Sequence, residues 1–303
     1  MKEELWKGFE ERELACYLYD EVKKPKGVVV VIHGMQEYAR RYKGFAEFLN
    51  SNGYIVFTTD LRGHGRNMID EKPGYEHGDI YANIVEDYKI FIARLKGKHK
   101  NLPIIVFGHS FGSFICQRLL TECDNLVDKF IMCGSAYTNS LAFKMGKVLA
   151  SITQFFKGPK GSAKLVEACS IKGYGKKFKD GNWLTRDESV WEEYKQDPFC
   201  GRAFPIGFYT SFFSNAVKNY KQLALVDEST PILLICGEND PVGSNVKSVI
   251  RLYNMYKKHW LNVDIKAYKG ARHELLNETN KKAVMEDILA FIEANNKVAK
   301  FRK

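Results

Sequence analysis

One stretch of the chain decides the fold, Ile104-Ile105-Val106-Phe107-Gly108-His109-Ser110-Phe111-Gly112. Its first four residues are apolar and predict a buried strand, while residues 113–120 suit a helix. Between the two, residues 108–112 fit the G-x-S-x-G pattern, which puts a serine on a sharp strand-to-helix turn. Glycine is needed there because the tight turn leaves no room for a side chain beside the serine. The sequence therefore predicts an exposed Ser110 hydroxyl on a strained turn.

Strands and helices alternate on both sides of this turn. The runs 28–32 and 232–236 are continuously apolar, which is typical of parallel strands covered on both faces. Helical periodicity lies between the strands, for example over 84–95 and 284–292. The alternation predicts an α/β fold with a mostly parallel, doubly wound sheet. The expected strands cover 14–19, 28–32, 54–59, 104–107, 130–133, 232–236 and 263–268.

Residues 137–205 interrupt this alternation. No strand pattern occurs in them, and residues 141–156 have the pattern of an amphipathic helix. We interpret the segment as a helical cap over a core that is made of residues 1–136 and 206–303. The cap contains 12 Lys and Arg against 7 Asp and Glu, so it carries half of the net charge of +10.

A serine hydroxyl is a weak nucleophile and needs a neighbouring imidazole that an acid orients. Asp240 and His273 each follow a predicted strand, at the edge where the functional groups of open α/β sheets gather. Their order after Ser110, acid and then histidine, is the order expected after this type of turn. We therefore predict that Ser110, Asp240 and His273 are the catalytic residues, with Glu238 as an alternative acid.

The transition state of acyl transfer also needs two backbone N–H donors for its oxyanion. The residue after the serine, Phe111, supplies one donor, and we assign the other to Met35 in the loop after an earlier strand. Gly34 and the cap residues Phe155 and Phe156 are weaker candidates for contact with substrate, because an acyl chain could lie beneath the apolar cap helix.

Composition excludes several classes of protein. With 303 residues, 45% hydrophobic and 27% charged, the chain is neither collagen, a coiled coil nor wholly disordered. No apolar run reaches the roughly 20 residues of a spanning helix, and the N-terminus lacks the apolar stretch of a signal peptide.

Seven cysteines without a C-x-x-C pair indicate a reducing compartment, so we predict a cytoplasmic location. Because metal-ligand spacings and nucleic-acid motifs are missing, we predict no metal, no organic cofactor and no nucleic-acid partner.

Several motifs together resemble the α/β-hydrolase superfamily, and within it the group of monoacylglycerol lipases, lysophospholipases and serine aminopeptidase-like enzymes. The matching segments are 33–37 (HGMQE) with Arg41-Tyr42, 60–66 (DLRGHGR), 108–112 (GHSFG), 237–242 (GENDPV) and 271–274 (ARHE). The resemblance covers about residues 14–295. It implies the α/β-hydrolase fold with a helical cap inserted after the sixth strand. It also implies a serine hydrolase that cleaves carboxylic esters through an acyl-enzyme.

The resemblance leaves the substrate open. A small ester with an acyl chain is expected, as in a monoacylglycerol or a lysophospholipid, and the basic cap suits contact with an anionic membrane surface. A serine aminopeptidase-like peptidase would need an acidic group for the substrate amine, for which Glu188, Glu192 and Glu193 are candidates. A thioesterase would use the same three catalytic residues. The alternative from another class is a ligand-binding protein without turnover. The sequence does not determine the oligomeric state.

Overall fold

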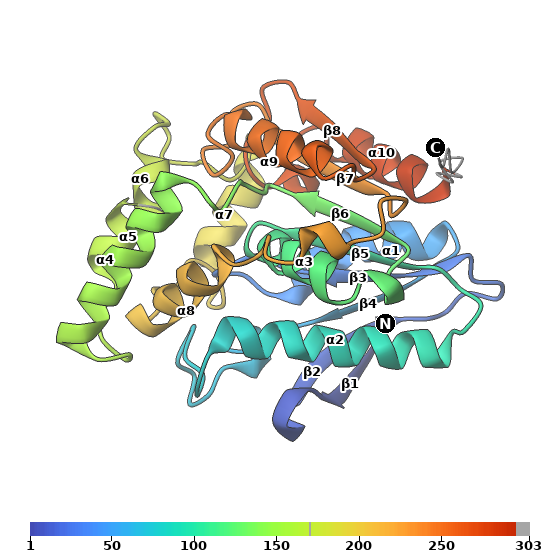
Figure 1. Cartoon of the computed structure of the whole chain (residues 1–303), viewed down its shortest axis with the longest axis horizontal. Coiled ribbons are helices and arrows are strands. Elements are labelled where there is room, and N and C mark those ends of the chain that lie inside the picture. The colour runs from blue at the N-terminus through green and yellow to red at the C-terminus, as the bar shows by residue number, and fades with distance from the viewer. Residues whose placement is uncertain (170, 295–303) are drawn as a thin grey trace.

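The computed structural model describes residues 1–169 and 171–294 and contains an eight-stranded sheet between two layers of helices (Figure 1). The strand order is β1-β2-β4-β3-β5-β6-β7-β8. The pairs β1–β2 and β2–β4 are antiparallel, and the remaining pairs are parallel. The predicted mostly parallel sheet is therefore confirmed. The strands are β1 (Lys2–Lys7), β2 (Glu13–Tyr19), β3 (Gly27–Ile32), β4 (Tyr54–Thr59), β5 (Ile104–His109), β6 (Lys129–Cys133), β7 (Ile232–Gly237) and β8 (Val263–Tyr268).

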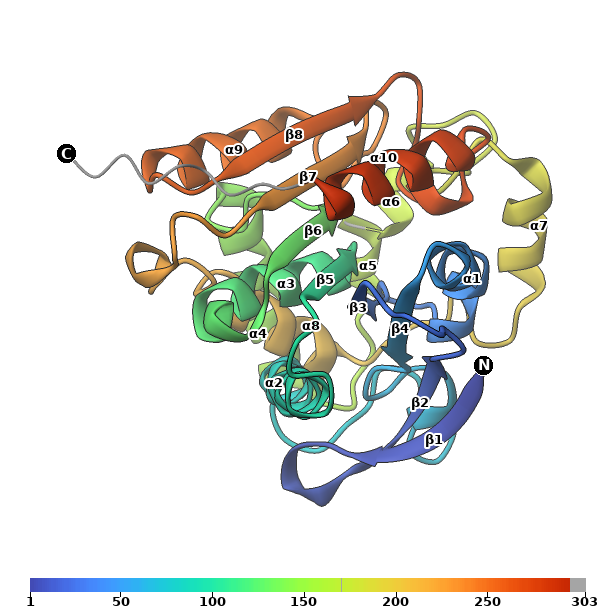
Figure 2. The ribbon, with the colours of Figure 1, turned by 90° about the vertical axis from the view of Figure 1, so that its right-hand side faces the viewer.

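Helices cover both faces of the sheet, as a doubly wound fold requires (Figure 2). The side chains of α2, α3 and α9 form one apolar core with the sheet, and those of α1 and α10 form the other. The central strand β3 is fully buried because both cores enclose it. The helices are α1 (Lys43–Ser51), α2 (Ile80–Lys98), α3 (Phe111–Glu122), α4 (Leu141–Lys157), α5 (Lys164–Cys169), α6 (Ile171–Gly175), α7 (Glu188–Gln196), α8 (Ile206–Ala216), α9 (Lys247–Lys258) and α10 (Lys281–Glu293).

The sequence pattern did not predict strand β1, which pairs antiparallel with β2 at the edge of the sheet. Only Trp6 of this strand is buried, and the other positions are mostly charged. Charged side chains on an edge strand discourage pairing with other chains, but they also remove the apolar alternation by which a strand is recognised. β1 makes β6 the sixth strand, and the helical segment follows it.

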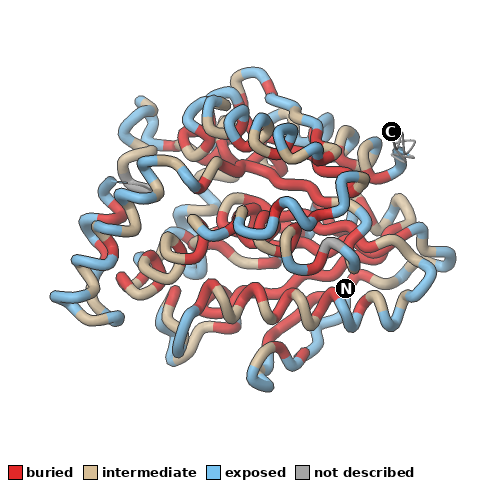
Figure 3. Tube along the Cα trace, viewed as in Figure 1, coloured by how far each residue is buried: buried red, intermediate tan, exposed pale blue. Residues whose placement is uncertain are grey.

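Helices α4 to α8 fill the chain between β6 and β7 and lie at one end of the sheet (Figure 1). Much of α4 and α5 is exposed, whereas strands β2 to β7 of the sheet are mostly buried (Figure 3). Helix α8 falls within the range predicted for the core, yet it packs against α4 as well as α2. The predicted cap boundary at residue 205 stays a prediction, and residues 170 and 295–303 lie outside the described residues.

Candidate active site

Ser110 lies on a strained turn between β5 and α3. Its φ of 52° and ψ of −118° are unusual for a residue with a side chain. The glycines on either side are required by close packing. A β-carbon on Gly108 would lie 2.4 Å from Sγ of Cys116, and one on Gly112 would lie 2.2 Å from the carbonyl oxygen of Ile32. The turn therefore holds α3 tightly against the sheet and presents Ser110 at its end.

Asp240 and His273 follow β7 and β8 and meet at the same edge of the sheet. Nδ1 of His273 lies 2.9 Å from Oδ1 of Asp240, and both side chains are buried. The geometry is that of a close polar contact rather than a well-aligned hydrogen bond. In the described part of the chain, Nε2 of His273 has no hydrogen-bond partner, and this ring lines the same cavity as Ser110. Glu238 is exposed and accepts a hydrogen bond from the N–H of Gly270 (3.0 Å), so the acid that pairs with the histidine is Asp240.

The histidine is enclosed by two further rings. The indole of Trp183 lies 5.0 Å from the ring of His273 between centroids, and the ring of His109 lies 4.8 Å away. The N–H of His273 also donates to the carbonyl of Trp183 (3.4 Å). Trp183 belongs to the cap segment, where no motif marks it. Its place beside the histidine depends on tertiary structure alone.

The residues of the two predicted oxyanion donors, Met35 and Phe111, line the same cavity as Ser110. Gly34 has a different position. Its N–H donates to Oε1 of Glu37 (2.6 Å), so this donor is already occupied within the protein. A β-carbon on Gly34 would lie 2.5 Å from that oxygen and 3.2 Å from Cβ of Ser110, so only glycine fits.

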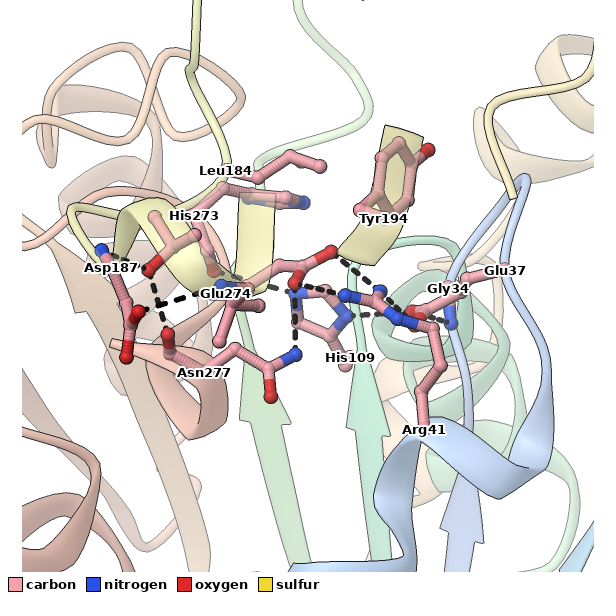
Figure 4. Close-up of polar contacts among 12 residues, drawn as sticks. Gly34, Glu37, Arg41, His109, Leu184, Asp187, Tyr194, His273, Glu274 and Asn277 are labelled. Atoms are coloured by element: carbon pink, nitrogen blue, oxygen red, sulfur yellow. Dashed lines mark hydrogen bonds and ion pairs between the residues drawn. The ribbon is translucent and has the colours of Figure 1, made fainter. Parts of the chain in front are cut away.

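A network of buried charges adjoins the site (Figure 4). The guanidinium of Arg41 donates to the carboxylates of Glu37 (2.8 Å) and Glu274 (2.7 Å twice). Nδ1 of His109 lies 3.1 Å from Glu37. Burial opposes the ionisation of Glu37, but His109 and Arg41 together hold its pKa well below the usual range. Burial also lowers the pKa of His109, but the contact with Glu37 raises it overall.

These four residues stand in the matching motifs, or beside them, but sequence reasoning assigned them no role. Arg41 and Glu274 are 233 positions apart in the chain. A pairing over such a distance has no local signal, and only the fold reveals it.

The cavity in front of Ser110 has a volume of about 840 Å³, which is within the range of pockets that bury a small ligand. Most of its wall is apolar. Many of its apolar lining residues come from α3, α4 and α8. They are Phe111, Phe114, Phe143, Val148, Leu149, Ile152, Phe212 and Phe213. The polar end, next to the serine, is lined by Gln36, Glu37, His109, Tyr194 and Glu274.

Phe155 and Phe156 do not line this cavity. Their exposed fractions are 85% and 78%, and they lie at the end of α4, past the part that faces the core. The predicted contact between these rings and substrate therefore stays a prediction, without support from the cavity lining. The length of α4 explains the difference, because Phe155 and Phe156 share the face of Ile152 but lie one turn further along the helix, beyond the cavity.

Comparison with known proteins agrees with this architecture. Residues 23–280 match the family described as serine aminopeptidase, S33. The chain is 26% identical over 272 residues to a monoacylglycerol lipase of Mycolicibacterium smegmatis, with 88% of each chain covered. It is 28% identical over 287 residues to a monoglyceride lipase homolog of monkeypox virus, covering 91% of this chain and 93% of the relative. The structure of a thermostable carboxyl esterase from Bacillus coagulans superimposes with a TM-score of 0.84 at 26% identity, over 96% of this chain and 97% of that one.

The fold and these likenesses define an α/β-hydrolase, related to esterases and lipases. Since the family match spans most of its length, the chain belongs to the serine aminopeptidase S33 family.

Proposed function

We propose that this protein is a serine esterase that hydrolyses long-chain esters of small, neutral alcohols such as glycerol. One observation carries the proposal: Ser110 and the ring of His273, with Asp240 behind it, open into one largely apolar cavity under α4. Relatives named monoacylglycerol lipase and a structural relative named carboxyl esterase support the same substrate class.

The residues divide the reaction in the following way. Oγ of Ser110 attacks the ester carbonyl while Nε2 of His273 takes its proton and then donates it to the departing alcohol. Asp240 stabilises the imidazolium that forms. The N–H groups of Met35 and Phe111 donate to the oxyanion of the tetrahedral intermediate. A water molecule then attacks the acyl-enzyme with His273 as base, which releases the fatty acid and restores Ser110.

The polar end of the cavity favours a neutral leaving group. Glu37 and Glu274 line it, and Lys144 on α4 is the one lysine or arginine among the described residues that line the cavity. A phosphate head group leaving from the serine would approach two carboxylates. A glycerol leaving group carries no charge and avoids this repulsion. This charge distribution supports a monoacylglycerol over a lysophospholipid, and over the phosphate-bearing thioesters of coenzyme A.

The peptidase alternative has less support. Glu188, Glu192 and Glu193 lie exposed on α7 and do not line the cavity. The carboxylates that do line it, Glu37 and Glu274, already accept hydrogen bonds from Arg41. A substrate amine would therefore have to compete with a guanidinium that is always charged.

The cap also suits contact with a lipid surface. Large apolar side chains with exposed fractions above 50% cluster on α4 and α5, and the same two helices carry four of the cap's lysines. Apolar side chains can enter the interface while lysines meet anionic head groups. None of the helices in the described part of the chain is long and apolar enough to cross a membrane. A cytoplasmic location remains part of the proposal, supported by buried, unbridged thiols such as Cys133 and Cys236.

Initial rates on p-nitrophenyl esters from acetate to palmitate test the proposal, followed by 1-monoacylglycerol, lysophosphatidylcholine and aminoacyl nitroanilides. We expect rates to peak at eight carbons or longer, and monoacylglycerol to exceed lysophosphatidylcholine at least tenfold in kcat/KM. Ser110→Ala should lose at least about a thousandfold in kcat, because the nucleophile is gone.

A peak at acetate or butyrate would contradict the long acyl chain. Faster cleavage of nitroanilides would favour the peptidase. Equal, negligible rates for the wild type and Ser110→Ala on every substrate would refute the catalytic assignment.

A further inference from the structure

Arg41 joins two loops that come from opposite ends of the sequence (Figure 4). Nη1 donates to Oε2 of Glu37 (2.8 Å) and to Oε1 of Glu274 (2.7 Å), and Nη2 donates to Oε2 of Glu274 (2.7 Å). The side chain of Arg41 is 11% exposed, and those of the two glutamates are 4% and 5% exposed. Such a paired, two-point contact fixes both distance and angle between the partners.

On one side, Glu37 fixes the loop that holds the predicted oxyanion donor. Its Oε1 accepts from the N–H of Gly34 (2.6 Å) and from the hydroxyl of Tyr42 (2.8 Å). Glu37 therefore holds the peptide unit next to the one that carries the Met35 N–H.

On the other side, Glu274 is the residue after His273. Its Oε2 also accepts from the side-chain amide of Asn277 (2.8 Å), and its N–H donates to the carbonyl of Leu184 (2.7 Å). Nε2 of His109 lies 3.3 Å from the carbonyl oxygen of His273. The backbone of the histidine is therefore held from several directions, and both the Arg41 pair and His109 link it to the oxyanion loop.

Arg41 does not face the substrate. The ring of Tyr194 on α7 lies 4.9 Å from the guanidinium, and Tyr194 lines the cavity whereas Arg41 does not. Arg41 instead lines a separate pocket of about 170 Å³ behind the site. Any effect of Arg41 on the reaction therefore passes through the residues that it holds.

We infer that Arg41 is a positioning residue that keeps the oxyanion loop and the His273 loop in register, through Glu37 on one side and Glu274 on the other. The inference rests on the proposed function, since it assigns reacting roles to Met35 and His273. When His273 becomes positively charged in the reaction, its loop must stay in place while the oxyanion forms at the N–H of Met35. One cation shared by two carboxylates couples the two positions.

Kinetics of Arg41→Lys and Glu274→Gln provide the first test. Lysine keeps the charge of Arg41 but loses the two-point contact, and glutamine keeps the shape of Glu274 but loses its charge. We expect kcat on a soluble p-nitrophenyl ester to fall at least thirtyfold in both variants, with KM changed less than threefold. The matched control is Arg62→Lys, since Arg62 makes a buried two-point contact with Asp87 (2.7 and 2.9 Å) away from the cavity. This control should keep kcat within threefold.

A loss in KM alone, or a kcat within threefold of the wild type in Arg41→Lys, would overturn the inference. So would an equal loss of kcat in Arg62→Lys, because the effect would then be one of stability.

A second measurement needs no activity, so it separates failure of this inference from failure of the proposed function. In proton NMR spectra, the Gly34 amide reports on the oxyanion loop, and the ring proton of His273 at Nδ1 reports on the histidine. Glu274→Gln should move the Gly34 amide resonance, and Glu37→Gln should move the His273 ring resonance. In each case the substitution is on one side of Arg41 and the reporting proton is on the other side. If each substitution affects only its own loop while both variants remain folded, Arg41 does not couple the loops.

Discussion

At the scale of single residues, packing around Ser110 leaves almost no freedom. The β5-to-α3 turn brings the backbone of α3 against the backbone of β3, at the distance that a glycine allows. A side chain at this point would collide with a carbonyl group of the central strand, which cannot move without disturbing the sheet. The glycines of the G-x-S-x-G pattern are therefore requirements of the fold as well as of the site.

Gly112→Ala should destabilise the protein by about 3 kcal/mol or more, because its β-carbon would lie 2.2 Å from the carbonyl oxygen of Ile32. Urea denaturation measures the change. Gly97→Ala is the matched control. Nothing lies within 4 Å of a β-carbon at this position in α2, and alanine favours helix by roughly 0.5–1 kcal/mol. A Gly112→Ala protein as stable as the wild type would contradict the close packing.

His64 makes the stability depend on pH. Its ring is packed among Phe111, Phe204 and Phe208, and burial lowers the pKa of His64 to about 3 from an ordinary 6.5. Below pH 6.5 His64 becomes protonated in the unfolded chain but stays neutral in the folded chain. Stability is therefore lost as the pH falls from 6.5 towards 3, by up to about 1.4 kcal/mol per pH unit.

Urea unfolding of the wild type and His64→Gln at pH 7 and pH 5 tests this. The wild type should lose about 2 kcal/mol more than the variant between the two values. His109 has the opposite sign, because its raised pKa stabilises the fold at low pH and this contribution is lost on going to high pH. Both proteins contain His109, so the comparison cancels it. Identical pH slopes would show that His64 is not protected from protonation.

At the scale of elements, α4 is a long helix with little buried surface. Ala150 is its one buried residue, although its sequence is strongly amphipathic. Part of its apolar side lines the cavity, and the end with Phe155 and Phe156 projects into solvent. Apolar surface of this kind usually has an unseen partner. The charge of the cap favours an anionic lipid surface.

Replacing Phe155 and Phe156 together by serine should weaken binding to vesicles of phosphatidylglycerol and phosphatidylcholine at least tenfold. Each buried aromatic ring contributes about 1.5–3 kcal/mol, and 1.4 kcal/mol corresponds to a factor of ten. Sedimentation with the vesicles measures the bound fraction. Trp260→Ser is the control, because Trp260 is 78% exposed but lies beyond α9. Unchanged binding by the double variant would remove α4 from the membrane proposal.

At the scale of the whole molecule, the chain between β6 and β7 has one part that is bonded to the core and another part that is largely exposed. Residues 180–187 are bonded to the loop that carries His273. Arg272 donates to Asp180 (2.8 Å), Thr185 donates to the carbonyl of Asn277 (2.6 Å), and Arg186 pairs with Glu278 (2.8 Å). Most residues of helices α4 and α5 are instead exposed.

Hydrogen exchange should therefore separate the two parts. Amides of residues 182–186 should exchange with solvent as slowly as those of the core. Amides of α4 should exchange at least about tenfold faster, because few buried contacts oppose local opening. Arg186→Gln should speed exchange at residues 182–186 and leave α4 unchanged. Uniform exchange across 141–196 would instead mean that this whole segment opens as one unit.

The sequence by itself determined most of the sheet and the turn that carries Ser110. Apolar runs predicted strands β2 to β7, since burial leaves a pattern in each strand alone, and a mixed run predicted the edge strand β8. The G-x-S-x-G turn and the order of Asp240 and His273 were also visible, because each depends on a strand that ends just before it. The edge strand β1 was not visible, since its exposed side chains carry no such pattern.

Only the tertiary structure decided what surrounds the catalytic residues. It placed Trp183 against His273, removed Phe155 and Phe156 from the cavity, and joined Arg41 to Glu274 across 233 positions. The physical reason is the range of the interactions. Helix and strand periodicity is set by neighbours within a few residues, whereas ring contacts and buried ion pairs form between loops that only the closed sheet brings together.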